Sequence, residues 1–138
     1  MQSHGHEPTP LERYFTALDT HEFEAALATL SDSCVYIRPP VRPAVGPHSN
    51  ALEAHVGKES VRAFLEARGR LAISHDIHAS ESAPGQCFVM GTATSLGAGE
   101  RTLFMAHALV DEAGSITRFI AVSSPLDPAA TEWIVRSR

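Results

Sequence analysis

Four side chains in this sequence are of the types that acid/base chemistry on a carbonyl compound requires. His75 is a histidine, whose ordinary pKa lies near neutrality, so it can remove a proton from the carbon next to a carbonyl group. The hydroxyls of Tyr14 and Tyr36 can each donate a hydrogen bond to a developing oxyanion. The guanidinium of Arg38 can hold an enolate or a carboxylate. We therefore predict these four residues as the catalytic set of an acid/base enzyme.

Each of these residues also has an ordinary structural explanation. Arg38 could form an ion pair with a nearby carboxylate or lie at a solvated edge. His75 could be a half-buried strand histidine bonded to a backbone carbonyl, and the two tyrosines could be core aromatics with satisfied hydroxyls. A register slip of one residue would turn Asp76 and His78 inward in place of His75.

The first half of the chain carries helix signals. Residues 1–8 show no such pattern and are predicted to be a flexible N-terminus. Thr9-Pro10-Leu11-Glu12 is a capping box with proline at the first helical position, which predicts a helix from this point. Asp19 predicts the start of a second helix. A third helix is predicted after Gly57, with Gly69 at its C-terminal stop.

A short strand and a long irregular segment separate the second and third predicted helices. Residues 34–38 predict a strand, with Tyr36 and Arg38 on one face because side chains alternate along a strand. Residues 39–56 contain four prolines, together with His48 and His55. A segment of this length without regular structure is typical of a lid or a binding loop.

The second half of the chain changes to a strand pattern. Residues 71–81, 86–95, 101–111 and 115–123 are rich in β-branched and aromatic residues and are separated by short glycine-containing turns. They predict an antiparallel meander. Helices followed by a run of strands indicate an α+β fold with the helices on one face of a curved sheet. Residues 125–138 are predicted as a C-terminal tail.

Composition narrows the possible classes of protein. The 138 residues, 43% of them hydrophobic, predict one globular domain. A formal net charge of -5 argues against nucleic acid as a partner, and no apolar stretch approaches the roughly twenty residues of a membrane helix. Cys34 and Cys87 make no disulfide framework, so a cytoplasmic location is predicted. No histidines have metal-ligand spacing, and we predict no metal site.

Four segments of the chain form a familiar pattern: Glu12–Asp19, Phe23–Leu30, Gly57–Phe64 and Gly114–Val122. Together they resemble the nuclear-transport-factor-2-like superfamily, especially its SnoaL-like and ketosteroid-isomerase-like members, over about residues 10–124. The resemblance implies a SnoaL-like domain over residues 9–124. In that domain three helices of the N-terminal half wrap a cone-shaped, curved antiparallel sheet around an apolar cavity. It also implies a homodimer.

The expected cavity wall follows from side-chain alternation together with the register of the family. Beside Tyr36 and Arg38, its predicted substrate-binding residues are Phe64, Met90, Thr92, Phe104, Ala106, Phe119, Ala121 and Ser123. His107 is expected to point outward, away from this wall. A mostly apolar wall with a few polar groups suits a small, poorly soluble ligand.

The catalytic aspartates of the superfamily are missing from this sequence. Tyr14 matches the oxyanion tyrosine of the steroid isomerases, but their general-base aspartate falls on Arg38 and their second aspartate near Ala106. The acid/base aspartate of the SnoaL cyclases falls near Ala121. Limonene-type epoxide hydrolases need an Asp-Arg-Asp arrangement, and Asp76 is the only aspartate within a predicted strand interior.

The scytalone dehydratases give the remaining match, because they use a strand tyrosine and a histidine just after the third helix. Tyr36 and His75 look similar to these two residues. Taken together, the sequence predicts an isomerase, cyclase or dehydratase without a cofactor. Its substrate would be a small apolar carbonyl compound of polyketide, terpenoid or steroid type. The alternative is a non-catalytic protein that binds a ligand in the same cavity, which the missing aspartates favour. A scaffolding role is supported by little beyond the fold.

Overall fold

The structure is a computed structural model that describes residues 7–40, 51–97 and 99–136. Its elements in chain order are α1 (Pro10–Asp19), α2 (Phe23–Ala28), β1 (Leu30–Arg38), β2 (Glu53–Val56), α3 (Lys58–Arg68), β3 (Ile73–Ala83), β4 (Gln86–Ser95), β5 (Arg101–Val110), β6 (Ile116–Pro125) and α4 (Pro128–Arg136). The predicted α+β class is confirmed, with three helices in the N-terminal half and most strands in the second half.

Helix α1 begins at the predicted capping box. The Thr9 hydroxyl accepts from the Glu12 amide at 3.2 Å, and the Glu12 carboxylate accepts from the Thr9 amide at 3.1 Å. These two bonds satisfy donors that every helix N-terminus leaves free. The helix ends at Asp19, and α2 starts at Phe23 without a side-chain cap. The predicted start of the second helix at Asp19 is therefore wrong.

The six strands form one sheet in the order β2-β1-β6-β5-β4-β3. The predicted antiparallel meander of β3 to β6 is confirmed by the register of its three neighbouring pairs. The sheet is nevertheless mixed, because β1 pairs in parallel with β6. The prediction of a fully antiparallel sheet is wrong at this pair, which joins the first strand to the last. No local sequence pattern marks a pairing over such a separation.

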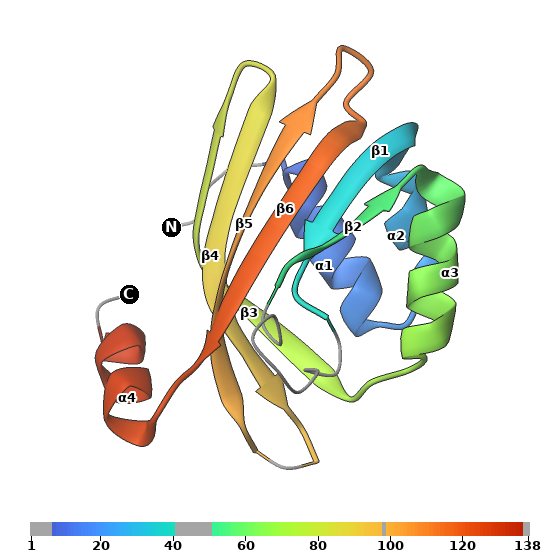
Figure 1. The fold of residues 1–138 in the computed structure, drawn as a ribbon. Helices are drawn as coiled ribbons and strands as arrows, with labels where there is room; N and C mark the ends of the chain where they lie inside the picture. Colours follow the sequence, from blue (N-terminus) through green and yellow to red (C-terminus); the bar gives the residue numbers. More distant parts are fainter. Residues whose placement is uncertain (1–6, 41–50, 98, 137–138) are drawn as a thin grey trace.

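Two segments predicted to be irregular contain regular elements. Strand β2 pairs with β1, so that His55 lies opposite Tyr36 rather than in a loop. His48 lies outside the described residues. The C-terminal tail contains α4, which stands apart from the other three helices in Figure 1. No helix in the described ranges is long and apolar enough to cross a membrane.

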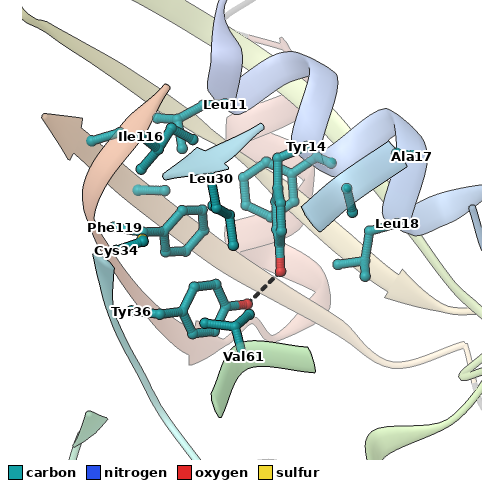
Figure 2. Packing of buried hydrophobic residues seen from close by; sticks show 14 of the residues in the cluster. Leu11, Tyr14, Ala17, Leu18, Leu30, Cys34, Tyr36, Val61, Ile116 and Phe119 are labelled. Atoms are coloured by element: carbon teal, nitrogen blue, oxygen red, sulfur yellow. Dashed lines mark hydrogen bonds between the residues drawn. The ribbon is translucent and has the colours of Figure 1, made fainter. Parts of the chain in front are cut away.

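Helices α1, α2 and α3 lie on one side of the sheet, which we call the helix-covered face (Figure 1). Between them and the sheet lies the core, in which Tyr14, Tyr36 and Phe119 are almost completely buried (Figure 2). Tyr36 stacks on Phe119 with ring centroids 4.6 Å apart, and Tyr14 packs on Phe119 at 5.0 Å. Burying a large apolar side chain stabilises the fold by about 1.5–3 kcal/mol, so this aromatic cluster is a main source of stability.

The opposite side of the sheet, which we call the outer face, carries apolar side chains that the helices do not cover. Met90 pairs with Met105, and Met105 pairs with Val122, so the three side chains form a row across β4, β5 and β6. Met105 and Val122 are 40% and 43% exposed. The two faces of the sheet are therefore unequally covered.

Candidate active site

The centre of the candidate site is a hydrogen-bonded contact between His75 and Asp19 that joins α1 to β3. His75 lies near the start of β3 on the helix-covered face, with its ring 4.8 Å from Phe15 and 5.2 Å from Phe104. Asp19, the last residue of α1, accepts a hydrogen bond from the His75 backbone amide at 2.8 Å. Its other carboxylate oxygen lies 2.5 Å from His75 Nδ1. One carboxylate thus fixes both the backbone and the ring of His75.

This contact sets the chemical state of the histidine ring. An ionised carboxylate only accepts hydrogen bonds, so Nδ1 carries the proton that it donates to Asp19. In the neutral ring Nε2 then has a free lone pair, and it has no hydrogen-bond partner among the described residues. A histidine held in this way is suited to general-base chemistry. Asp19 was not predicted as a site residue, because its spacing to Glu22 resembles a helix start.

A β-bulge decides which residues of β3 face the helices. Ile77 pairs with Gly91 and Ala79 pairs with Met90, so His78 is the extra residue. His78 Nε2 lies 3.0 Å from the Thr92 hydroxyl, and Asp76 is exposed. His75 is therefore the residue that faces the helices. The register slip that would have placed Asp76 and His78 inward does not occur.

The hydroxyls of Tyr14 and Tyr36 form a hydrogen bond with each other, shown as the dashed line in Figure 2. Burial raises the pKa of Tyr14 well above its ordinary value, and the neighbouring Tyr36 raises it further. One hydroxyl must donate to the other, so the pair retains one proton for a further acceptor. Tyr14 and Tyr36 were predicted as two hydrogen-bond donors to the substrate, but together they can offer only one. Both side chains are fully buried.

Arg38 lies beside this pair at the end of β1. Its guanidinium carbon is 5.0 Å from the centre of the Phe64 ring, and its Nε donates to the Pro39 carbonyl at 2.9 Å. Phe64 also packs on Tyr36, at 5.9 Å between ring centres, and on His55, at 4.7 Å. The His55 ring, predicted to lie on an irregular segment, is therefore half-buried in β2 against the candidate site. The alternation of β2 would have indicated this if the strand had been recognised.

The sheet register tests the predicted cavity wall. The wall residues of β5 and β6 lie on the helix-covered face, where Phe104, Ala106 and Phe119 are buried, Ala121 is partly buried and Ser123 is exposed. Met90 and Thr92 belong to the other face, because Phe104 pairs with Gly91 and side chains alternate along β4. Their predicted place in the wall is therefore wrong.

A pocket of about 1110 Å³ lies between α4 and the ends of the neighbouring strands. Thr131 and Arg136 of α4 line one side, and Ile73 and Ala93 of β3 and β4 line another. None of the predicted site residues lines this pocket, although Ala93 is the sheet partner of His75. We place the candidate chemistry at His75, because the pocket itself contains no comparable base held by a carboxylate.

The two cysteines are buried free thiols. Burial raises the pKa of Cys34 to about 11, and it also raises that of Cys87. A thiol in this state is not a nucleophile near neutral pH. In the described part of the chain, no cluster of three or more histidine, cysteine or acidic side chains could hold a metal ion.

The SnoaL-like domain family matches residues 11–119, and the chain belongs to this family. No curated protein matches the chain. The resemblance predicted from the sequence is confirmed, and NTF2-like proteins are also among the similar solved structures.

Three of these structures illustrate the range of activities on the shared fold. A candidate ketosteroid isomerase from Kribbella flavida is 15% identical, with a TM-score of 0.65 over 86% of this chain and 77% of that chain. A candidate polyketide cyclase from Sinorhizobium meliloti is 15% identical, with a TM-score of 0.61 over 90% of this chain and 100% of that chain. An epoxide hydrolase from M. tuberculosis is 18% identical, with a TM-score of 0.64 over 92% of this chain and 87% of that chain. Such identities show the fold alone, so the chemistry must be argued from the site.

Proposed function

We propose that this protein is a cofactor-independent isomerase, cyclase or dehydratase that acts on a small apolar carbonyl compound of polyketide, terpenoid or steroid type. The observation that carries the proposal is the contact between His75 Nδ1 and the Asp19 carboxylate, which leaves Nε2 as a base. Membership of the SnoaL-like family supports it, because similar structures include candidate isomerases and cyclases.

In the proposed mechanism, His75 Nε2 takes a proton from the carbon next to the substrate carbonyl. The electron pair of the broken C–H bond moves to the carbonyl oxygen and forms an enolate. Asp19 stabilises the imidazolium, and the remaining proton of the tyrosine pair or the Arg38 guanidinium stabilises the enolate oxygen. Return of the proton to another carbon gives isomerisation. If the imidazolium gives the proton to a β-hydroxyl, the hydroxyl leaves as water and the result is dehydration. If the enolate carbon attacks a second carbonyl, the oxygen of that carbonyl takes the proton and the result is cyclisation.

The alternative is a protein that binds such a compound without converting it. It is supported by the resemblance, which puts catalytic aspartates of the superfamily at Arg38 and near Ala106 and Ala121, where this chain has none. It is also supported by the complete burial of the tyrosine pair. The two proposals differ in one observable, which is proton exchange on the ligand.

Deuterium exchange tests the proposed function without knowledge of the natural substrate. A panel of aromatic polyketides, enones and steroid-like ketones is incubated in D2O with the protein, and NMR follows loss of the proton next to each carbonyl. We expect the wild type to accelerate exchange for at least one compound and His75→Ala to lose the acceleration. Binding without accelerated exchange in the wild type would instead support the alternative.

The homodimer remains a prediction from the resemblance, and we propose the outer face as its interface. Met105 and Val122 expose apolar surface there that a second copy would cover. Sedimentation of Met105→Asp is expected to show a monomer where the wild type shows a dimer. A monomeric wild type would overturn this proposal.

A further inference from the structure

Two arginines are near Phe64, one from β1 and one from the same helix as Phe64. Arg38 covers the Phe64 ring at 5.0 Å from β1. Arg68 follows Phe64 by four residues on α3, and residues with this spacing lie on the same side of a helix. The two arginines influence each other electrostatically, since burial lowers the pKa of Arg68 and the charge of Arg38 lowers it further. Like charges are thus brought together at this point.

Among residues 7–40, 51–97 and 99–136, no side-chain carboxylate pairs with either guanidinium. All 16 acidic residues belong to the described ranges, because residues 1–6, 41–50, 98, 137 and 138 include no Asp or Glu. Within those ranges, no acidic side chain makes an ion pair with Arg38 or Arg68. A partly buried pair of like charges without a counter-ion is costly, and an anion offsets that cost.

Two carboxylates near the arginines are engaged elsewhere. Glu53 lies opposite Arg38 in the β1–β2 ladder, but its carboxylate lies 3.7 Å from His55 Nε2 and makes no ion pair with Arg38. Asp19 acts on Arg68 only through its charge, because both of its oxygens bind His75.

We propose that Arg38 and Arg68 together bind a carboxylate group of the substrate, next to Phe64 and the Tyr14–Tyr36 pair. The substrate class is then an apolar carbonyl compound that bears a carboxylate, rather than a neutral one. Phe64 supplies the apolar contact, and the guanidiniums supply charge-assisted hydrogen bonds. The proposal rests on the proposed function for the reacting centre and adds the group that anchors the ligand.

The test compares two probes of the same shape, 2-naphthoate and the neutral 2-naphthamide, by isothermal titration calorimetry. We expect the wild type to bind the carboxylate at least about tenfold more tightly, and the double variant Arg38→Gln/Arg68→Gln to lose this preference. Arg70→Gln removes an exposed arginine two residues beyond Arg68 and should keep it. Arg68→Lys, which keeps the charge, should retain part of the preference.

Three results would overturn the carboxylate site. They are equal affinity of the wild type for both probes, no binding of naphthoate at millimolar concentration, and an unchanged preference in a folded double variant. Circular dichroism of each variant confirms folding. Because this experiment needs no turnover, its failure leaves the proton-transfer proposal at His75 standing. A failed deuterium exchange would likewise leave the binding preference standing.

Discussion

Two histidines of β3, His75 and His78, differ in their position on the strand and in the groups that they contact. His75 faces the helices, with Nδ1 held by the Asp19 carboxylate. His78 occupies the bulge and contacts the Thr92 hydroxyl at 3.0 Å. The carboxylate at His75 Nδ1 stabilises the positive charge that a base acquires when it takes a proton. The comparison shows that the partner and the face, not the residue type, make a histidine a candidate base.

The largest expected effect comes from removing one histidine at a time. His75→Ala should slow exchange of the proton next to a substrate carbonyl by about 10²–10⁴-fold, since this is the usual contribution of a general base. His78→Ala is the matched control on the same strand and should change the rate by less than about threefold. If both variants are folded and lose the same share of the exchange rate, His75 is not distinguished from His78 as the base.

The second largest effect is expected from a change to Asp19, the hydrogen-bond partner of His75. Asp19→Asn keeps a side-chain oxygen for the His75 backbone amide but removes the charge next to the ring. We expect a loss of about 10–100-fold in the same exchange rate, with little change in ligand affinity. A rate like that of the wild type would show that the carboxylate only positions the strand.

The third effect concerns the bulge at His78, where Ile77 pairs with Gly91. A Cβ at Gly91 would lie 2.3 Å from the Asp76 carbonyl oxygen and 2.9 Å from the Phe104 ring. Gly91→Ala should therefore destabilise the fold by about 1–3 kcal/mol, measured by urea unfolding. Gly97→Ala is the control, since a Cβ there meets nothing within 4 Å. Equal midpoints for both variants would contradict the close approach of β3 to β4.

The smallest effect concerns the tyrosine pair. Tyr36→Phe removes one hydroxyl of the buried hydrogen bond and should cost about 1 kcal/mol in unfolding free energy. Burial is the main cause of the raised pKa of Tyr14, so ultraviolet titration of the variant should still find Tyr14 ionising well above its ordinary value. Ionisation of Tyr14 in the ordinary range would show that Tyr36, and not burial, controls it.

Local patterns predicted much of the fold. The capping box at Thr9 and the meander of β3 to β6 each depend on a few neighbouring residues, and both are present. Features that depend on distant partners could not be predicted in this way. The parallel pairing of β1 with β6 is one, and the bulge at His78 is another.

The candidate site shows the same division. His75, Tyr14, Tyr36 and Arg38 could be selected from residue type and resemblance, and the structure places each of them against the aromatic core or its edge. Asp19 could not be selected in this way, because its partner His75 lies 56 residues away in the sequence. Met90 and Thr92 were misplaced because side-chain alternation gives a face only after the cross-strand register is known.

The most direct test of the central claim is the tautomer of His75, measured by NMR of the imidazole nitrogens in uniformly ¹⁵N-labelled protein. We expect neutral His75 to carry its proton on Nδ1, with the chemical shift of an unprotonated nitrogen at Nε2, and this preference to weaken in Asp19→Asn. A neutral ring protonated on Nε2 in the wild type would contradict the account, because the nitrogen that must act as the base would then have no free lone pair.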